Sequence, residues 1–286
     1  MMIQEEKVFG VAGGDSRQVW LTRSLLEDGH TVYTTGLEKA PLDKRARQVS
    51  FSELAEICDV VIFPLPVTAD GVHLNAPFSQ APLLLGEGIA SLLEGKRVYG
   101  GMVNRLYATG EAWERVSVFD YLRQEELAVR NAVPTAEGAI QLAMEKSPDT
   151  LSGSRCLVTG FGRIGKVLSS MLRGLGARVT VSARKPEDLA WIRLSGYEAV
   201  HTRHPGSGYD FIFNTVPALV FTREVLSRLE PGTLLIDLAS APGGVDWESA
   251  EALGISVISA LSLPGKVAPK AAGEIIKETI YHMMEE

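Results

Sequence analysis

The stretch RCLVTGFGRIGKVLSSMLRGLGARVTVSAR, residues 155–184, decides the fold. An apolar run leads into a turn with the spacing G-x-G-x-x-G, and apolar residues at helical spacing then lead to a second apolar run. This order predicts a strand, a helix and a second strand, the unit of a nucleotide-binding parallel sheet. We expect Gly160, Gly162 and Gly165 to form the tight turn, admit pyrophosphate to the backbone, and let the helix pack closely on the strand.

The end of the second predicted strand carries no acidic residue. In NAD-binding units an Asp or Glu about twenty residues after the glycine turn holds the ribose hydroxyls. Here Ser182, Arg184 and Lys185 occupy this position. A hydroxyl and a guanidinium favour the 2′-phosphate of NADP, because both make charge-assisted hydrogen bonds to it. The sequence therefore predicts NADP as the cofactor, with solvated charges at a strand end as the alternative.

Further cofactor contacts are expected at the carboxyl ends of other strands, because a doubly wound sheet binds ligands outside these ends. FNTVPAL, residues 213–219, follows one apolar run, and LASA, residues 238–241, follows the next. For the first segment, a turn built by Asn and Pro is the alternative. The predicted cofactor residues are Gly160, Gly162, Arg163, Ile164, Gly165, Ser182, Arg184, Lys185, Asn214, Thr215, Val216, Pro217, Leu238, Ala239 and Ser240.

A second glycine turn, VAGGDSRQ at residues 11–18, begins a similar unit near the N-terminus. Asp15 stands where the following helix should begin, so its carboxylate is expected to cap that helix and repel phosphate. We therefore expect this unit not to bind a second dinucleotide. Apolar runs alternate with helical segments in both halves, which predicts an α/β protein with two Rossmann-like, doubly wound parallel-sheet domains and a cleft between them.

Three parts of the chain are expected. Residues 1–130 form an N-terminal α/β domain on the substrate side, residues 131–265 form the NADP-binding domain, and residues 266–286 form a C-terminal helix that packs back on the first domain. With 286 residues, of which 45% are hydrophobic, the chain is long enough to bury a sizeable core.

Composition argues against several classes of function. A net charge of −7 gives no basic face for nucleic acid or an anionic membrane. No apolar run approaches the roughly 20 residues that span a bilayer, and the N-terminus lacks a signal-peptide pattern, so a cytoplasmic protein is expected. Cys58 and Cys156 lie in separate apolar runs and are expected to be buried. His201 and His204 have no third ligand nearby, so no metal site is expected.

Five stretches together resemble one family: VAGGDSRQ, NAVPTAEGAIQLAM, the glycine-turn segment, IDLASAPGGVDWESAEALGI and LPGKVAPKAAGEII. Over nearly the whole chain they are similar to the A subunit of bacterial dipicolinate synthase. The resemblance implies an NADP-dependent dehydrogenase that oxidises dihydrodipicolinate to dipicolinate (pyridine-2,6-dicarboxylate) in the mother cell of a sporulating bacterium. It also implies a flavoprotein-like partner, the B subunit of dipicolinate synthase, and we expect a homo-oligomer.

A dicarboxylate substrate calls for cationic groups and helix N-termini. Arg17 follows the first glycine turn, and Lys270 begins the last helix. Thr135 is expected to begin the helix PTAEG, with Glu137 in its first turn. These four residues are the predicted catalytic or substrate-binding groups. Each has a plainer alternative: a helix cap for Thr135, a dipole contact for Glu137, and surface charges for the two cations.

Other functions fit parts of the sequence. A 2-hydroxyacid dehydrogenase shares the two-domain layout, but it requires an Arg after the fifth strand, where LIDLASAPGG offers none. An adenosylhomocysteinase-like hydrolase would use NAD and keep an acid at positions 182–184. A non-catalytic NADP-binding subunit that supports the B subunit, or another NADP-dependent two-domain dehydrogenase, remains compatible with the sequence.

Overall fold

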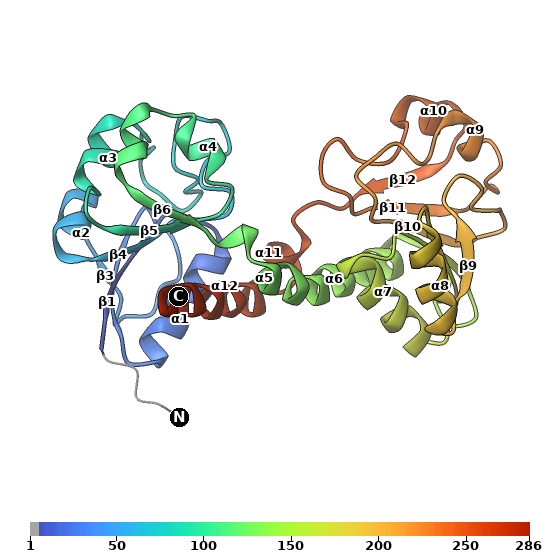
Figure 1. Cartoon of the computed structure of the whole chain (residues 1–286), viewed down its shortest axis with the longest axis horizontal. Coiled ribbons are helices and arrows are strands. Elements are labelled where there is room, and N and C mark those ends of the chain that lie inside the picture. The colour runs from blue at the N-terminus through green and yellow to red at the C-terminus, as the bar shows by residue number, and fades with distance from the viewer. Residues whose placement is uncertain (1–5) are drawn as a thin grey trace. The chain divides into compact units, whose positions relative to one another are not determined.

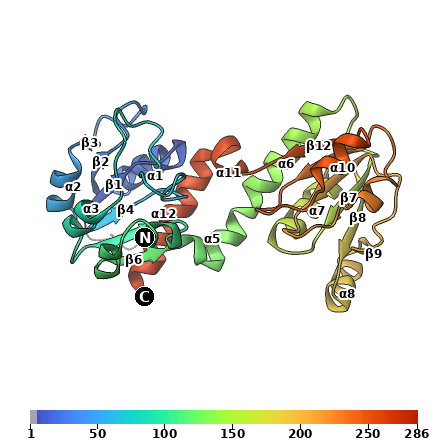
Figure 2. The ribbon, with the colours of Figure 1, turned by 90° about the horizontal axis from the view of Figure 1, so that it is seen from above.

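The computed structural model describes residues 6–286, and the chain divides into two compact units (Figures 1 and 2). The first unit contains residues 6–130 and 268–286, and the second contains Asn131–Val267. The chain thus leaves the first unit after Arg130 and returns to it at Ala268. The C-terminal helix is therefore part of the N-terminal unit.

Each unit contains a six-stranded sheet in which every pairing between named strands is parallel. The strand orders are β3-β2-β1-β4-β5-β6 and β12-β11-β10-β7-β8-β9. Both orders reverse direction beside the first strand of the unit, which confirms the predicted pair of Rossmann-like, doubly wound domains. The strands of the first unit are β1 (Val8–Ala12), β2 (Thr31–Thr35), β3 (Arg47–Gln48), β4 (Val60–Ile62), β5 (Arg97–Gly100) and β6 (Ser117–Asp120). Those of the second are β7 (Arg155–Thr159), β8 (Arg178–Ala183), β9 (Glu198–His201), β10 (Phe211–Asn214), β11 (Leu234–Asp237) and β12 (Ser256–Ser259).

Helices cover both faces of each sheet (Figure 1). In the first unit they are α1 (Ser16–Glu27), α2 (Phe51–Ile57), α3 (Glu87–Leu92), α4 (Asn104–Tyr107), α5 (Glu125–Arg130) and α12 (Pro269–Glu285), with short 3₁₀ turns at Glu111–Arg115 and Tyr121–Arg123. In the second they are α6 (Ala132–Lys146), α7 (Arg163–Gly174), α8 (Pro186–Leu194), α9 (Arg223–Leu226), α10 (Trp247–Ala252) and α11 (Leu263–Val267).

The central strands bury side chains on both faces of each sheet, so their sequences are continuous apolar runs rather than alternating ones. In β7, Cys156 and Val158 pack into one core and Leu157 packs into another. Cys58 and Cys156 are both fully buried free thiols, as predicted. Burial raises the pKa of Cys58 to about 11 and that of Cys156 to about 12, which makes both thiols unreactive.

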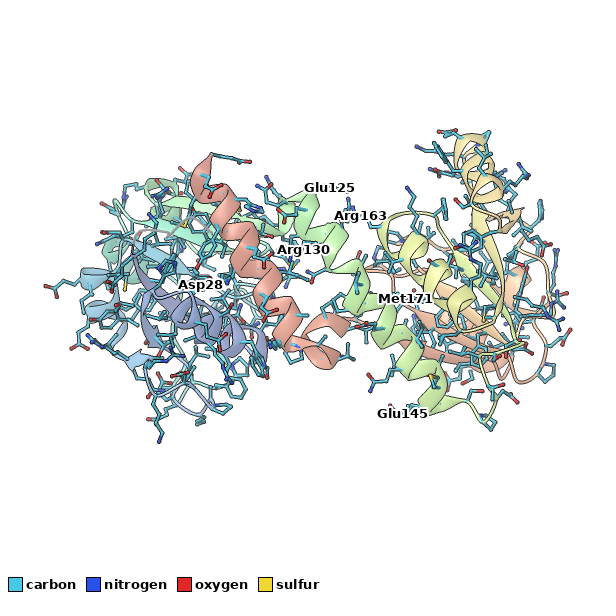
Figure 3. The ribbon with its side chains drawn as sticks, turned by 90° about the horizontal axis from the view of Figure 1, so that it is seen from below. Asp28, Glu125, Arg130, Glu145, Arg163 and Met171 are labelled. Carbon is cyan, nitrogen blue, oxygen red and sulfur yellow. The ribbon has the colours of Figure 1, made fainter. Side chains whose placement is uncertain are left out.

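The last helix, α12, packs along α1 of the first unit. Gly273 allows this close approach, because a Cβ there would lie 2.5 Å from the carbonyl oxygen of Arg17. The buried ammonium of Lys277 pairs with the Asp28 carboxylate, which also accepts a hydrogen bond of 2.9 Å from the Tyr281 hydroxyl. Arg130, which is labelled beside α12 in Figure 3, pairs with Glu278 at 2.5 Å. Apolar packing and buried polar contacts together hold α12 on the first unit.

Candidate functional site

The glycine turn between β7 and α7 has no room for side chains at two of its three glycines. Gly160 has a φ of +92°, and a Cβ there would lie 2.6 Å from Thr215 Oγ1. A Cβ at Gly165 would lie 2.1 Å from the carbonyl oxygen of Gly160. The turn is therefore tight, and α7 packs directly against it, as the sequence predicts for these two positions.

Gly162, the third glycine, has a different environment. It is the N-cap of α7, no side chain caps this helix, and a Cβ at Gly162 would meet nothing within 4 Å. The backbone N–H groups in the first turn of a helix have no partner within the helix and carry partial positive charge. Open space beside an uncapped helix start is what a pyrophosphate requires. Arg163 is the first residue of α7, and Ile164 packs against the core.

A cavity of about 620 Å³ lies beside this turn. Gly160 and Phe161 line it on the side of the turn, Arg184 and Lys185 line it just beyond β8, and Val216 lines it after β10. A further basic segment at the end of β9 also lines the cavity. In the sequence analysis its two histidines were considered only as metal ligands. The other lining residues are Ala183, Asp188, His201, Thr202, Arg203, His204, Ala218, Leu219, Val220, Thr222, Glu224 and Val225.

Ser182, a predicted cofactor residue, is not among the residues that line this cavity. Its side chain is fully buried, and its hydroxyl accepts a hydrogen bond of 3.4 Å from Thr202 Oγ1. Its carbonyl oxygen accepts the N–H of Gly160 at 2.8 Å. Ser182 therefore supports the glycine turn and the β9 loop from inside the sheet, while Arg184 and Lys185 supply the charge.

The side chain of Asn214, another predicted cofactor residue, is buried and builds the loop that follows β10. The buried amide oxygen accepts hydrogen bonds from Thr159 Oγ1 at 2.5 Å and from the N–H of Val216 at 3.2 Å. The amide nitrogen donates to the Val216 carbonyl at 3.1 Å and to Asp237 Oδ1 at 2.8 Å. Both amide donors and both acceptor positions are thus used. Asn214 therefore fits the alternative interpretation of this segment, a turn built by Asn and Pro.

Asp237, at the end of β11, is the residue at this edge that sequence reasoning missed. Its buried carboxylate also accepts the N–H groups of Ala239 at 3.2 Å and Gly244 at 3.1 Å. Together with Thr159 and Asn214 it links the carboxyl ends of three neighbouring strands. An acidic residue directly after the apolar run LLI was the available signal.

The other predicted residues of this edge divide by burial. Leu238 and Ala239, both predicted cofactor residues, have buried side chains, at 7% and 5% exposure. Thr215 donates its hydroxyl to the Thr159 carbonyl at 2.7 Å and lies against Gly160. Pro217 and Ser240 are exposed.

The first glycine turn, between β1 and α1, is occupied by the chain's own side chains. Asp15 caps α1 by accepting the N–H of Arg17 at 2.9 Å, and Gln18 completes a capping box by accepting the N–H of Asp15 at 3.2 Å. The Gln18 side chain also covers Gly14, where a Cβ would lie 2.3 Å from Gln18 Oε1. A carboxylate and an amide therefore occupy the place that the second unit leaves open.

Arg17 lies almost buried at this turn, with 11% of its side chain exposed. Its Nε and Nη2 groups donate to the two carboxylate oxygens of Asp15 at 2.9 and 2.8 Å, and Nη2 also donates to the Leu65 carbonyl. Burial opposes the charge, but the bonds to Asp15 and its attraction outweigh burial and raise the pKa of Arg17. The guanidinium is thus fixed and charged where β1 and β4 end side by side, at the reversal of the first sheet.

The other predicted substrate residues have less specific surroundings. Lys270 lies in the first turn of α12 with 62% of its side chain exposed, 3.8 Å from Glu274 and over the ring of Trp20. Thr135 does not begin its helix, because α6 starts at Ala132; its hydroxyl donates to the Asn131 carbonyl at 2.7 Å. Pro134 is tolerated there because it lies in the first turn, so the helix extends past it. Glu137 is exposed on α6.

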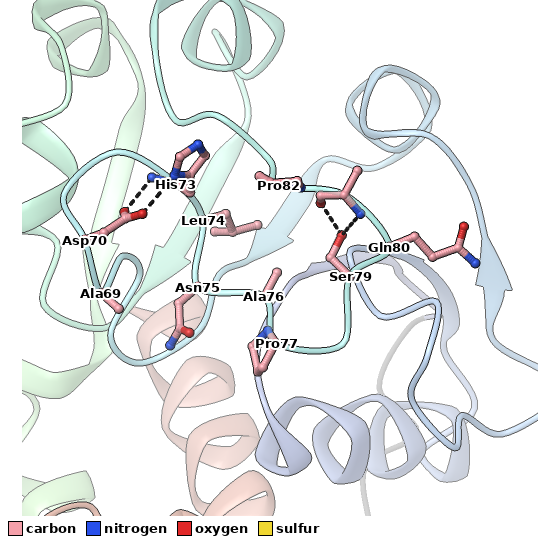
Figure 4. A pocket seen from close by; sticks show the side chains of 11 residues that line it. Ala69, Asp70, His73, Leu74, Asn75, Ala76, Pro77, Ser79, Gln80 and Pro82 are labelled. Atoms are coloured by element: carbon pink, nitrogen blue, oxygen red, sulfur yellow. Dashed lines mark hydrogen bonds and ion pairs between the residues drawn. The ribbon is translucent and has the colours of Figure 1, made fainter.

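A second cavity, of about 410 Å³, lies in the connection between β4 and β5 of the first unit (Figure 4). Asp70 and His73 pair on its wall with 2.8 Å between Oδ2 and Nδ1. Hydrogen bonds from the N–H and ring of His73 and from the N–H of Val72 hold the pKa of Asp70 well below its usual range. Asn75, another wall residue, accepts the N–H of Gly14 through its carbonyl at 2.8 Å, so this cavity borders the first glycine turn.

Two kinds of feature are absent from residues 6–286. These residues contain no group of three or more His, Cys, Asp or Glu side chains arranged to hold a metal ion. None of their helices is long and apolar enough to cross a membrane.

The fold and the open glycine turn define a two-domain protein with a nicotinamide-nucleotide-binding domain of the dehydrogenase type. Residues 124–246 match the family model of the D-isomer specific 2-hydroxyacid dehydrogenase NAD binding domain, and residues 8–122 match that of the N-terminal domain of the dipicolinate synthase A subunit. The dipicolinate synthase A subunit of Bacillus subtilis (strain 168) is 32% identical over 284 residues, which cover 96% of this chain and 95% of the relative. The chain belongs to the family of dipicolinate synthase A subunits.

Solved structures agree with this assignment. The crystal structure of the dipicolinate synthase A subunit from Bacillus halodurans has a TM-score of 0.86 and 29% identity, with 98% of each chain covered. A transhydrogenase from Sinorhizobium meliloti has a TM-score of 0.68 and 17% identity, with 98% of this chain and 92% of the other covered. The second likeness shows the shared fold alone.

Proposed function

We propose that this chain is the dehydrogenase subunit of a dipicolinate synthase and oxidises dihydrodipicolinate to dipicolinate with NADP⁺ in the mother cell of a sporulating bacterium. The observation that carries the proposal is the uncapped start of α7, open at Gly162, beside a cavity lined by Arg184 and Lys185. Relatives named as dipicolinate synthase A subunits, which match nearly the whole chain, support the choice of substrate.

The residues of the second unit fit NADP better than NAD. The N–H groups at the start of α7 would bind the pyrophosphate, and Arg184 and Lys185 would bind the 2′-phosphate. An NAD site would instead present an acid at the end of β8, where the chain has Ser182 and Ala183 before the two cations. NADP⁺, when bound, supplies the acceptor for one hydride.

The reaction requires little acid–base chemistry from the protein. Dihydrodipicolinate loses one hydride and one proton and becomes aromatic, so the products are dipicolinate, NADPH and a proton. The protein must mainly bind and orient a dianion. Arg17 is the best supported anchor for a substrate carboxylate, because it is charged, almost buried and fixed by Asp15. Lys270 and the first turn of α6, with Thr135 and Glu137, are secondary candidates.

Two alternatives have specific support. The names of the relatives, as A subunits, imply a partner B subunit, so the chain would serve as a non-catalytic NADP-binding subunit if the chemistry occurs on the partner. Its nucleotide domain also matches the 2-hydroxyacid dehydrogenase family. However, residues 235–244 after the start of β11 contain no Arg for a 2-hydroxyacid carboxylate.

The test follows the absorbance of NADPH as purified chain, NADP⁺ and dihydrodipicolinate are mixed, with and without the B subunit. The proposal predicts NADPH formation by this chain, and a parallel reaction with a 2-hydroxyacid should give none. Activity only in the presence of the B subunit would indicate a shared active site. No NADPH under either condition rejects the dehydrogenase function.

A further inference from the structure

We propose that His201, the last residue of β9, and the loop that follows it, residues 202–204, form a second wall of the phosphate site. Together with Arg184 they would set the preference for NADP over NAD. This inference rests on the proposed binding of NADP in the second unit. Its basis is that His201, Arg203 and His204 line the same cavity as Arg184 and Lys185. In the sequence, the two histidines of this HxxH pattern were weighed only as metal ligands, and no metal site was expected there.

Backbone contacts fix this loop against the end of β8. The N–H of Thr202 donates to the Ala183 carbonyl at 3.1 Å, and the Thr202 hydroxyl donates to Ser182. The loop then turns, with the N–H of His204 donating to the His201 carbonyl at 2.8 Å. The backbone segments that carry the basic residues after β8 and at the end of β9 are therefore held side by side, so their side chains can converge on one compact anion.

The three side chains offer different donors. His201 Nδ1 accepts the N–H of Arg203 at 3.2 Å, so the neutral ring carries its proton on Nε2 and is a donor without being charged. Arg203 supplies a guanidinium, whose planar set of donors suits a phosphate. His204 supplies a second imidazole on the wall of the cavity.

The charges of the cavity favour a dianion over a hydroxyl. Arg184, Lys185 and Arg203 face it, against the carboxylates of Asp188 on α8 and Glu224 on α9. Lys185 also lies 4.0 Å from Glu187, so part of its charge is already engaged. The two arginines are thus the main permanent cations for a phosphate. The 2′-hydroxyl of NAD carries no charge and gains nothing from them.

The test is the binding affinity of NADP⁺ and NAD⁺ for the full chain and its variants. Arg203→Ala should raise the Kd for NADP⁺ about tenfold and leave that for NAD⁺ unchanged. His204→Asn should weaken NADP⁺ binding about two- to threefold and leave NAD⁺ binding unchanged. Arg193→Ala, at an exposed arginine of the same unit outside the cavity, is the matched control.

The outcomes separate this inference from the function it rests on. NADP⁺ preference in the unmodified chain, with Arg203→Ala within twofold of the Arg193→Ala control, overturns the second wall and leaves the proposed cofactor intact. A chain that does not bind NADP⁺ contradicts both. Thermal unfolding of each variant shows whether a lost affinity reflects misfolding, and unchanged NAD⁺ binding gives the same control within one experiment.

Discussion

The two glycine turns of this chain have the same place in the same topology and opposite contents. Each follows the first strand of a six-stranded parallel sheet and leads into a helix of 12 residues. At α1, Asp15 and Gln18 satisfy the helix start and cover Gly14. At α7 no side chain caps the helix, and the space at Gly162 is open. The side chains of Asp15 and Gln18 fill the first turn, whereas the second turn has space for an anion.

The difference shows that a doubly wound sheet supplies a possible phosphate site, and the residue at the helix start decides whether it is used. A carboxylate at the N-cap satisfies the same N–H groups that a pyrophosphate would bind, and it repels phosphate. In the first unit the same carboxylate also fixes Arg17 as a cation. The first turn is thereby converted from a nucleotide site into a candidate carboxylate site.

The largest effect is expected from Gly162→Val, which fills the open turn. A branched side chain there would occupy the space of the pyrophosphate, so NADP⁺ affinity should fall more than about a hundredfold. The fold should survive, because a Cβ at Gly162 meets no atom within 4 Å. Gly174→Val, at another glycine of α7 with open space, is the control for helix propensity and should bind normally. Full NADP⁺ affinity in Gly162→Val would show that the second glycine turn does not bind the cofactor.

The next effect concerns the phosphate that distinguishes the two cofactors. Arg184→Ala should weaken NADP⁺ binding about ten- to a hundredfold and leave NAD⁺ binding nearly unchanged, because a hydrogen bond to a charged group is lost. Parallel titrations of the two cofactors measure this directly. If the unmodified chain binds both equally, the assignment of NADP is wrong.

Opening the first turn gives a smaller, structural effect. Asp15→Ala removes the cap of α1 and the ion-pair partner of the almost buried Arg17, which should lower the free energy of unfolding by at least about 1 kcal/mol, measured with urea. It should not create a second dinucleotide site, because Gln18 still covers Gly14. Calorimetry of NADP⁺ binding should therefore give an unchanged stoichiometry. An additional site in this variant would show that the carboxylate alone had closed the turn.

The smallest effect tests how α12 is attached to the first unit. A hydrogen bond from His282 to Glu126 raises the pKa of His282 above its ordinary value, and the same bond lowers the pKa of Glu126. Because the raised pKa belongs to the folded state, this stabilisation is complete below the unfolded pKa of about 6.5 and is lost as the pH rises through the folded value. Both groups are exposed, so less than about 1 kcal/mol is expected.

The measurement is the urea stability of the unmodified chain and of His282→Gln on either side of this pH window. The unmodified chain should have the larger free energy of unfolding at low pH, and its difference from the variant should shrink as the pH rises. A constant difference between the two proteins would mean that the ion pair does not contribute.

The sequence was sufficient for the architecture because the buried strands are long apolar runs and both glycine turns have the expected spacing. The edge strands β3 and β6 escaped prediction, since β3 has only two residues, both exposed, and β6 is a four-residue strand, SVFD, with no buried residue. The start of α6 was misplaced because Pro134 suggested a boundary, although a proline is tolerated in a first helical turn.

The site was predicted less completely, because some of its residues are neighbours in space without being close in the sequence. Arg184 and Lys185 lie at a fixed distance from the glycine turn along the chain, so spacing identified them. The basic loop at residues 201–204 joins them only because β9 pairs with β8, which spacing does not reveal. Spacing also does not reveal the direction of a side chain: those of Ser182 and Asn214 are buried and hydrogen-bonded within the sheet edge.

The most direct test of the central claim is a crystal structure of the chain with NADP⁺. We predict the pyrophosphate on the N–H groups at the start of α7, beside Gly162, and the 2′-phosphate between Arg184 and the loop after β9. The turn at Gly13 and Gly14 should hold no dinucleotide. A cofactor bound at Gly13 and Gly14, or a 2′-phosphate away from Arg184, would contradict the account.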